Sequence, residues 1–472
     1  MPGTTGCESL LKEGKEVRSV KELKEKVLYE ECGVTEALLR LAVPTAIGQI
    51  ILVIYNMTDT FFVGLTGNDA MLTAVTVCMP AFMFLSAISN LFGIGGASVI
   101  SRALGAGNHE RVRNTSAFAF WGCFAITFLY AASAFLGRHM FIDLLGGTNI
   151  MVHDHAVSYM VCTVAAGGLI TSAGALLSHL LRAEGRSFLA GFGVTLGGIL
   201  NIILDPLFMF YILPPGREAL GAAIATALGN TISLVYFILV LVVIRKQTNI
   251  SLRIRKGMLQ EKIPADVLSA GLPACVMTLF ENVSYAFLDK LMSLQGLAMQ
   301  TGIGVAKKIN MLAHSIVRGI AQGALPLIGY NYASGNYRRM RDSVRTAQIL
   351  AVGTALVCMA VNLALADEMT SLFIHHEAQS FQYGTKFLRI LCIGGPPSAS
   401  AYLFISFFQA TGEAKRSLLL ALLRKGLIDI PLMFLLGAVI PVYGIVIATP
   451  AADAICCITA ALMYFRYIRK MA

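Results

Sequence analysis

Residues 38–64 read LLRLAVPTAIGQIILVIYNMTDTFFVG, an apolar run that contains one proline, Pro44, and one acid, Asp59. A helix of about 20 mostly apolar residues crosses the hydrocarbon layer of a membrane, so this run is long enough to span it. An acid at that depth costs roughly 2.5–3.5 kcal/mol to insert and marks a functional site by default. The run therefore predicts a transmembrane helix that carries a functional carboxylate.

The composition of the whole chain is that of an integral membrane protein. Of its 472 residues, 56% are hydrophobic and 14% are charged, whereas soluble domains contain roughly 25% charged residues. A soluble domain of this composition would expose a large apolar surface and aggregate. The 10 cysteines lie mostly in apolar runs and form no C-x-x-C motif. Composition thus excludes a soluble enzyme, a disordered chain and a disulfide scaffold.

Eleven further apolar runs resemble the first, so we expect twelve transmembrane helices. Glycine, asparagine and proline separate several of them. The twelve runs cover residues 38–64, 71–101, 115–137, 156–181, 187–212, 219–244, 265–291, 297–326, 344–365, 382–410, 416–439 and 443–466. Residues 1–35 are rich in Lys and Glu and contain no apolar segment, which favours a cytoplasmic tail over a signal peptide.

The distribution of positive charge predicts the orientation of the chain. Lys and Arg concentrate in the loops after the even-numbered runs and in the C-terminal tail. Such loops face the cytoplasm in membrane proteins. Both termini are then cytoplasmic, as an even number of spans requires. The net charge of +10 is explained by this topology, and we expect no binding of nucleic acid.

The two halves of the chain repeat one another at a separation of about 225 residues. The matching segments are LAVP ending at Pro44 with AGLP ending at Pro273, Gly107-Asn108 with Gly335-Asn336, and residues 220–226 with residues 443–449. A duplicated six-span unit predicts an all-α integral membrane protein with two six-helix lobes related by a pseudo-twofold axis along the membrane normal. Secondary transporters are built in this way. We expect a tail over 1–35, an N-lobe over 36–246, a basic cytoplasmic linker over 247–263 and a C-lobe over 264–472.

The energy source and the chemistry are limited by what the sequence lacks. It contains no G-x-x-x-x-G-K-[ST] motif that would cradle the phosphates of ATP. It also has no soluble domain large enough for an ordinary active site, so we do not expect an enzyme. An ion gradient or passive flow must then drive any transport.

Two further polar residues join Asp59 in the first half. Asn201 and Asp205 are four residues apart in the run 187–212 and so share one helix face. Pro206 follows directly and has no N–H group, which frees a carbonyl one turn earlier. Two carboxylates, an amide and nearby hydroxyls suit Na⁺ or a shared proton. The alternative is that these acids only join helices by hydrogen bonds.

The second half also contains ionisable residues within its apolar runs. Glu281 has no basic residue three or four positions away, so an ion pair within its own helix does not explain it. Lys307 and Lys308 are candidate partners for Glu281 or for Asp289, an acid near the end of the same run. Lys425 and Asp429 are four residues apart, which favours a structural ion pair. The clusters His153/His155 and His375/His376/Glu377 have no further ligand nearby and predict no metal site.

Four segments together resemble a known family. They are Pro44 with Asp59 fifteen residues later, LRAEG at 181–185, NIILDP at 201–206 and QGALPLIGYNY at 322–332. Over residues 36–470 the chain resembles a transporter of the multidrug and toxic compound extrusion (MATE) family, bacterial type. The resemblance implies a V-shaped pair of six-helix lobes and an ion-coupled antiport cycle.

The resemblance also implies roles for individual residues. The cation-coupling site would consist of Asp59, Asn201, Asp205 and Thr226, with Asp59 and Asp205 as the metal ligands if the ion is Na⁺. Pro44 and Pro206 would act in conformational change. The candidates for substrate binding or for a second site in the C-lobe are Glu281, Lys308, Gln49 and Tyr55. Because residues 382–410 contain no Asp or Glu, a complete second cation site is not expected.

The expected function is export of cationic or amphipathic drugs and toxic organic compounds in exchange for H⁺ or Na⁺. No cofactor is expected besides the coupling ion, and we expect a monomer in the inner membrane of a bacterial cell. One alternative is a metabolite exporter or a flippase for lipid-linked oligosaccharides from the same superfamily. A flippase would hold a pyrophosphate with cations inside the membrane, and Lys307, Lys308, Arg318, Arg424 and Lys425 all lie in the second half. A membrane-embedded glycosyltransferase is a further alternative, but the loops are short and basic.

Overall fold

The computed structural model describes residues 26–147, 149–260, 262–374 and 378–471. Helices joined by short connections make up this part of the chain, and no strand occurs within it. Most of the expected tail and the residues His375, His376 and Glu377 lie outside the described ranges. The predicted all-α membrane fold is confirmed.

The first half forms a π-helical segment followed by a set of long helices. They are η1 Val27–Glu31, α3 Val34–Leu65, α4 Asp69–Gly105, α5 His109–Leu136, α6 Arg138–Leu144, α7 Ile150–Met160, η2 Val161–Ala166, α8 Gly168–Ala183, α9 Ser187–Pro206, η3 Leu207–Ile212 and α10 Glu218–Val243.

The second half repeats the pattern after the short 3₁₀ segment η4 Lys256–Leu259. Its helices are α11 Ile263–Gln295, α12 Leu297–Ala333, α13 Tyr337–Ala364, α14 Ala366–Ser371, α15 Ala378–Ile393, α16 Gly395–Ala410, α17 Ala414–Leu422, η5 Leu423–Leu427, α18 Asp429–Val439 and α19 Tyr443–Met471.

Nine helices of the described residues are long and apolar enough to cross a membrane. Two bent pairs, α7–η2 with α8 (48°) and α15 with α16 (43°), raise the number to 11. The expected span 416–439 is the broken helix α17–η5–α18, which is interrupted by a π-helical segment containing Arg424 and Lys425. Because it contains two buried cations and a break, it is not a continuous apolar helix.

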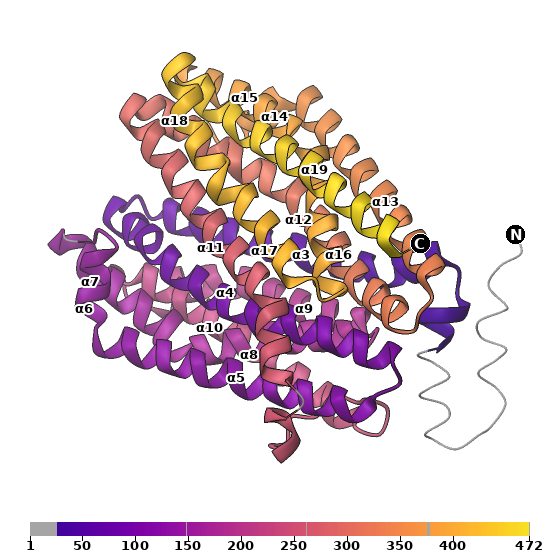
Figure 1. The fold of residues 1–472 in the computed structure, drawn as a ribbon. Helices are drawn as coiled ribbons and strands as arrows, with labels where there is room; N and C mark the ends of the chain where they lie inside the picture. The colour runs from indigo at the N-terminus through magenta and orange to yellow at the C-terminus, as the bar shows by residue number, and fades with distance from the viewer. Residues whose placement is uncertain (1–25, 148, 261, 375–377, 472) are drawn as a thin grey trace, which may run out of the picture.

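The helices form two lobes, α3–α10 and α11–α19, as expected from the repeat (Figure 1). The lobes diverge towards the end that carries α6, α7 and α18 and come together near the C-terminus. Where they meet, α3 packs on α12 and α4 packs on α11. The molecule is therefore closed at one end and splayed at the other.

Equivalent turns follow the second long helix of each half, α4 and α12. Gly107 and Gly335 have φ angles of +69° and +77°, a left-handed conformation that glycine adopts without strain and that ends α4 and α12. Asn108 and Asn336 then cap the next helices: Asn108 Oδ1 accepts from Arg111 N at 2.9 Å, and Asn336 Oδ1 accepts from Arg339 N at 3.1 Å. The repeated Gly-Asn pairs are thus helix stop and start signals.

Glycines make the contact between the lobes very close. A Cβ atom on Gly271 of α11 would collide with the carbonyl oxygen of Leu91, and one on Gly95 of α4 would collide with that of Val267. On the other side of the interface, Gly323 of α12 lies against Ala42 of α3. By the repeat, Gly95 corresponds to Gly323, so the same device is used twice.

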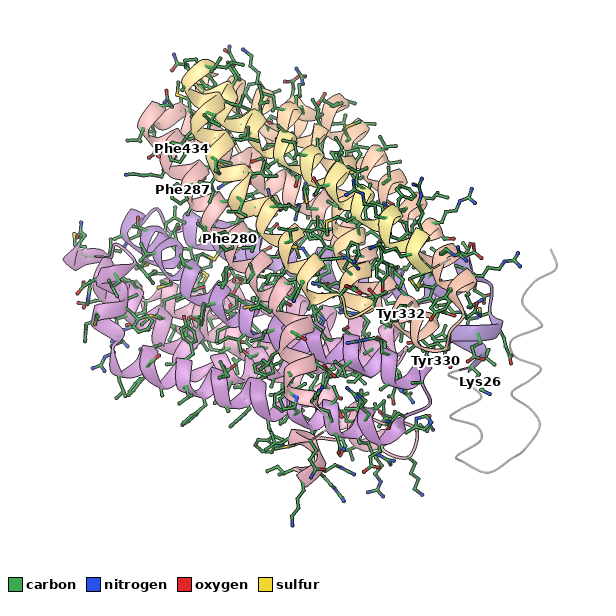
Figure 2. The ribbon with its side chains drawn as sticks, viewed as in Figure 1. Lys26, Phe280, Phe287, Tyr330, Tyr332 and Phe434 are labelled. Atoms are coloured by element: carbon green, nitrogen blue, oxygen red, sulfur yellow. The ribbon has the colours of Figure 1, made fainter. Side chains whose placement is uncertain are left out.

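The segment η1 crosses the closed end and touches both lobes. Tyr29 is fully buried, its ring stacks on Tyr330 at 4.6 Å, and its hydroxyl donates to the carbonyl of Ala183 at 3.2 Å. Arg339 Nε donates to the carbonyl of Tyr29 at 2.6 Å. Figure 2 shows Tyr330 and Tyr332 at this end, next to Lys26. Because Ala183 belongs to the N-lobe, η1 bridges the two lobes.

Candidate functional site

The four polar residues expected to form the N-lobe site come together from three helices. Asp59 extends from α3, Asn201 and Asp205 from α9, and Thr226 from α10. Their exposed fractions are 6%, 2%, 0% and 4%, so the cluster is buried. The i, i+4 spacing on α9 puts the amide and the carboxylate on one face, as expected.

Small residues let these three helices approach. A Cβ on Gly229 of α10 would lie 2.7 Å from the carbonyl oxygen of Gly197 on α9. A Cβ on Gly198 would lie 2.6 Å from Ile51 and 3.2 Å from the ring of Tyr55, both on α3. Tyr55 is thus buried against α9, one turn from Asp59. Close packing of α3, α9 and α10 is what brings the acids together.

Hydrogen bonds link the cluster through the amide of Asn201. Thr226 Oγ1 donates to Asp59 Oδ2 at 3.3 Å. In the amide orientation that satisfies both of its ends, Asn201 Nδ2 donates to Asp59 Oδ1 at 3.0 Å and its oxygen accepts from the backbone N–H of Thr226 at 3.2 Å. Asp205 Oδ2 is buried and accepts no hydrogen bond from any described residue.

This arrangement is incomplete without a positive charge. The two ends of the Asn201 amide lie 3.0 Å from Asp59 Oδ1 and 3.3 Å from Asp205 Oδ1, so one small group separates the two acids. Two carboxylates this close in a buried site cannot both be ionised unless a proton or a cation lies between them. The available ligands are carboxylate, amide and hydroxyl oxygens, which suit a proton or a hard cation such as Na⁺. No cluster of three or more His, Cys, Asp or Glu side chains suited to a metal occurs among the described residues.

The two prolines lie at changes in helix packing. Pro44 is inside α3, and a Cβ on Gly191 of α9 would collide with its carbonyl oxygen. Pro206 is the last residue of α9, and the chain continues as the π-helical segment η3. Proline has no N–H group to donate to the carbonyl one turn earlier, and the helix changes from α- to π-helical hydrogen bonding directly after Pro206. Gln49 is half-buried on α3, one turn beyond the lobe contact at Ala46.

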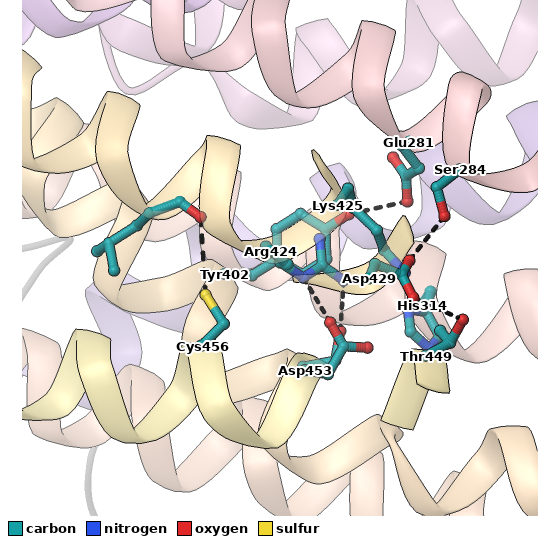
Figure 3. Close-up of polar contacts among 12 residues, drawn as sticks. Glu281, Ser284, His314, Tyr402, Arg424, Lys425, Asp429, Thr449, Asp453 and Cys456 are labelled. Carbon is teal, nitrogen blue, oxygen red and sulfur yellow. Dashed lines mark hydrogen bonds and ion pairs between the residues drawn. The ribbon is translucent and has the colours of Figure 1, made fainter. Parts of the chain in front are cut away.

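The C-lobe contains a buried network of paired charges instead of an acid pair (Figure 3). Glu281 Oε2 accepts from Arg318 Nη2 at 2.9 Å, and Glu281 Oε1 accepts from the hydroxyl of Tyr402 at 3.2 Å. Arg424 Nε donates to Asp453 Oδ1 at 2.8 Å. The guanidinium group of Arg424 also stacks over the Tyr402 ring at 3.9 Å. Sequence reasoning did not identify Arg318 or Tyr402 as the partners of Glu281.

The remaining cations of the C-lobe are also mostly neutralised. Lys307 pairs with Asp289, and Lys425 Nζ lies 3.2 Å from Asp429 Oδ2, which is the ion pair that the spacing predicted. Neither lysine pairs with Glu281. Lys308 is half-buried, and no carboxylate of the described residues forms an ion pair with it.

Comparison with known proteins points to one family. The sequence model of the MatE family matches residues 44–207 and again residues 273–435, one match in each lobe. The chain is 25% identical over 445 residues to the multidrug export protein MepA of Staphylococcus saprophyticus, which covers 94% of this chain and 96% of that protein. The MepA protein of Staphylococcus haemolyticus is 24% identical over 437 residues, covering 93% and 94%.

Solved structures show the same fold. A multidrug resistance MATE family transporter of the MOP superfamily, solved in an outward-facing conformation, aligns with a TM-score of 0.85 at 23% identity. The alignment covers 94% of this chain and 98% of that one.

Proposed function

Since the chain belongs to the MATE family, we propose that it is a secondary antiporter that exports cationic or amphipathic organic compounds in exchange for H⁺ or Na⁺. Two family matches, one in each lobe, support a complete transporter with both halves of the repeat. The multidrug export relatives support organic drugs and toxic compounds as substrates.

The proposed orientation places both termini in the cytoplasm of a bacterial cell, with the chain in the cell membrane. The basic loops after the even-numbered spans support it, because they lie at the end where the lobes meet (Figure 1). The lobes diverge at the opposite end, so this conformation is outward-facing. In the cycle, the lobes would close outside and part at the cytoplasmic end.

The observation that carries the proposal is the buried Oδ2 oxygen of Asp205, which accepts no hydrogen bond from any residue that the structure describes and lies in the same cluster as the carboxyl group of Asp59. A buried polar atom without a partner costs roughly 1–3 kcal/mol and more when it is charged. A coupling ion bound between the two acids removes that cost. We therefore propose that Asp59, Asn201, Asp205 and Thr226 bind the ion.

Coupling follows if the ion and the substrate exclude each other. An ion from outside binds the acids and weakens substrate binding, and loss of the ion inside favours substrate capture. A ligand shifts a two-state equilibrium only by its different affinity for the two states. Helix α3 links the two events, because it carries Asp59 and also packs on α12 through Ala42 and Ala46. Movement of Asp59 would thus reach the lobe contact directly.

The paired charges of the C-lobe argue against a flippase for pyrophosphate-linked lipids. The cations considered for a flippase are Lys307, Lys308, Arg318, Arg424 and Lys425. Four of these five are engaged by carboxylates, and Lys308 is the one with no such pair among the described residues. A doubly charged pyrophosphate would need several free cations at one place. Organic cations and amphipathic compounds need none.

Dye uptake into inverted membrane vesicles tests the proposal. Ethidium uptake is measured with a proton gradient and, separately, with a sodium gradient. Asp205→Asn is expected to reduce gradient-driven uptake at least tenfold at equal expression. Asp367→Asn is the matched control, because Asp367 is an exposed acid on α14 that pairs with Arg389. Uptake by Asp205→Asn at the wild-type rate, or wild-type uptake driven by neither gradient, would contradict the proposal.

A further inference from the structure

The N-lobe site has a counterpart at the same position of the C-lobe. Asn201 lies four residues before Asp205, and Lys425 lies four residues before Asp429. Lys425 follows Asn201 by 224 residues, and Asp429 follows Asp205 by the same 224 residues. Thr226 corresponds to Thr449 in the repeated segments of α10 and α19. Three of the four site residues in the N-lobe therefore have a polar equivalent.

The counterpart is also similar in three dimensions. Asp429 Oδ1 accepts from Thr449 Oγ1 at 3.1 Å, whereas Thr226 in the N-lobe donates to Asp59 and not to Asp205, the counterpart of Asp429. Asp429 Oδ2 accepts from Ser284 Oγ at 2.6 Å and from Lys425 Nζ at 3.2 Å (Figure 3). Asp429 is 0% exposed and Lys425 is 1% exposed.

The two sites differ in charge and in hydrogen bonding. The C-lobe has an ammonium group where the N-lobe has the neutral amide of Asn201. The offset of 229 residues that relates Pro44 to Pro273 assigns Leu288 as the counterpart of Asp59. The C-lobe has thus lost one acid and gained one base. Both oxygens of Asp429 have donors, whereas Asp205 Oδ2 has none among the described residues.

From these differences we propose that the C-lobe holds a second monovalent cation site whose cation is the ammonium group of Lys425. An ammonium group donates three hydrogen bonds and carries the same charge as Na⁺ or H₃O⁺. Because it is covalently attached and fully buried, it cannot be released to either side of the membrane. Only the N-lobe site then exchanges an ion, and each transport cycle is coupled to one bound ion. This inference rests on the proposed function and adds the stoichiometry to it.

The surroundings keep Lys425 charged and in place. Its ammonium group lies 5.7 Å from the centre of the Tyr285 ring, a cation–π contact that adds to the ion pair. The ring of Phe280 lies against the next residue, Gly426, where a Cβ atom would be 2.8 Å from the Phe280 ring. The ammonium group therefore lies between the Asp429 carboxylate and the Tyr285 ring.

Counting the ions bound by purified protein in detergent tests the proposal. Bound Na⁺ is measured with radioactive ²²Na⁺, and bound H⁺ is measured as the protons released when ethidium is added to a weakly buffered solution. We expect one ion per wild-type molecule, two for Lys425→Asn, none for Asp205→Asn and one for the double variant. One ion in Lys425→Asn would overturn the inference and leave the proposed function intact. One ion in Asp205→Asn would overturn the proposed function.

A reverse variant protects the test against loss of folding in Lys425→Asn. Asn201→Lys places an ammonium group in the N-lobe site, as in the C-lobe. The midpoint of thermal unfolding of the wild type should rise with Na⁺ or H⁺ concentration, because an ion bound only to the folded state stabilises it. The midpoint of Asn201→Lys should no longer depend on that ion and should be no lower than that of the ion-free wild type. A midpoint that still rises with the coupling ion would contradict a tethered ammonium group acting as the ion.

Discussion

At the scale of single residues, the two carboxylates singled out in the two lobes have opposite surroundings. Asp205 lies beside another acid, and its Oδ2 oxygen has no donor in the part of the chain that the structure describes, whereas Glu281 is held by Arg318 and Tyr402. A carboxylate that already has a cationic partner has little affinity left for a further cation. This contrast supports the proposal that the ion is exchanged in the N-lobe, while Glu281 belongs to the paired charges of the C-lobe.

Removal of the charge at Glu281 is expected to lower stability. Glu281→Gln leaves the guanidinium group of Arg318 next to Arg424 without its counter-ion. Breaking a fully buried pair costs roughly 3–5 kcal/mol, and the 35% exposure of the Arg318 side chain reduces this. We expect a loss of about 2 kcal/mol in the free energy of unfolding, measured by thermal unfolding in detergent.

The double variant Glu281→Gln/Arg318→Gln is the control for that prediction, because it leaves no unpaired charge. It should recover most of the lost stability. If the single and double variants are equally unstable, the ion pair is not the cause of the loss.

Asp59, Asn201 and Asp205 were predictable because charge is rare in the apolar runs and because Asn201 and Asp205 follow the helical period, whereas Thr226 was assigned through the family resemblance. The pair Lys425 and Asp429 was predictable for the same reason. Arg318 and Tyr402 were not, because they reach Glu281 from other helices, 37 and 121 residues away in the sequence. The register of the repeat was the one available signal for matching Lys425 with Asn201.

At the scale of helices, the apolar runs predicted where the spans lie but not their breaks: twelve were expected, and the described residues contain nine unbroken candidates and two bent pairs. The span at 156–181 bends at Gly167, and that at 382–410 bends at Gly394, both at glycine pairs that interrupt a helix. The π-helical segment η5 was not predicted. It places Arg424 and Lys425 towards different partners, Asp453 and Asp429, although the two are adjacent in sequence.

The crossing of α4 and α11 predicts the effect of a single methyl group. In the closed cytoplasmic end, Gly271→Ala would place a Cβ against the backbone carbonyl of Leu91, which cannot move aside as a side chain can. Alanine is also the better helix former, so any loss arises from the contact and not from helix propensity. We expect the variant to shift the equilibrium towards the inward-facing state. The distance between spin labels at Glu110 of α5 and Arg341 of α13, both exposed, should increase.

Gly304→Ala on α12 is the matched control, since an added Cβ there meets no heavy atom within 4 Å. It should leave the distribution of label distances unchanged. Equal distributions for Gly271→Ala and the wild type would contradict the prediction, because they would show that the crossing accommodates the added methyl group.

At the scale of the whole molecule, closure of the end that we propose to be cytoplasmic involves contacts between the lobes and with η1. Direct contacts include Arg111 with Asp266 at 2.5 Å, Arg182 with Gln322 at 2.8 Å and Asn90 with Thr278 at 2.9 Å. The segment η1 adds a third body between the lobes. Sequence reasoning assigned all residues up to 35 to a tail, because the short segment VLYEE has neither the length nor the apolarity of a span.

The position of η1 predicts that Tyr29 favours the outward-facing state. Tyr29 binds the N-lobe through the Ala183 carbonyl and the C-lobe through the Tyr330 ring and the Arg339 side chain. When the lobes part at this end, one set of these contacts must break. Tyr29→Ala removes the stacking and the N-lobe hydrogen bond, each about 1 kcal/mol. Because only one of the two sets breaks, about 1 kcal/mol of the preference for the outward-facing state is lost, and the ratio of outward- to inward-facing molecules should fall by roughly fivefold, since 1.4 kcal/mol corresponds to a factor of 10.

The same spin labels at Glu110 and Arg341 measure that ratio in lipid nanodiscs. Tyr337→Ala is the control, because Tyr337 is an exposed aromatic residue at the same end whose ring contacts Tyr332 of its own lobe. It should leave the ratio within twofold of the wild type. If Tyr29→Ala also leaves it there, η1 follows one lobe passively and the glycine crossings alone hold the cytoplasmic end closed. If the ratio falls as expected, the segment that precedes the first span is part of the gate, and changes to it will alter transport without touching either the ion site or the substrate.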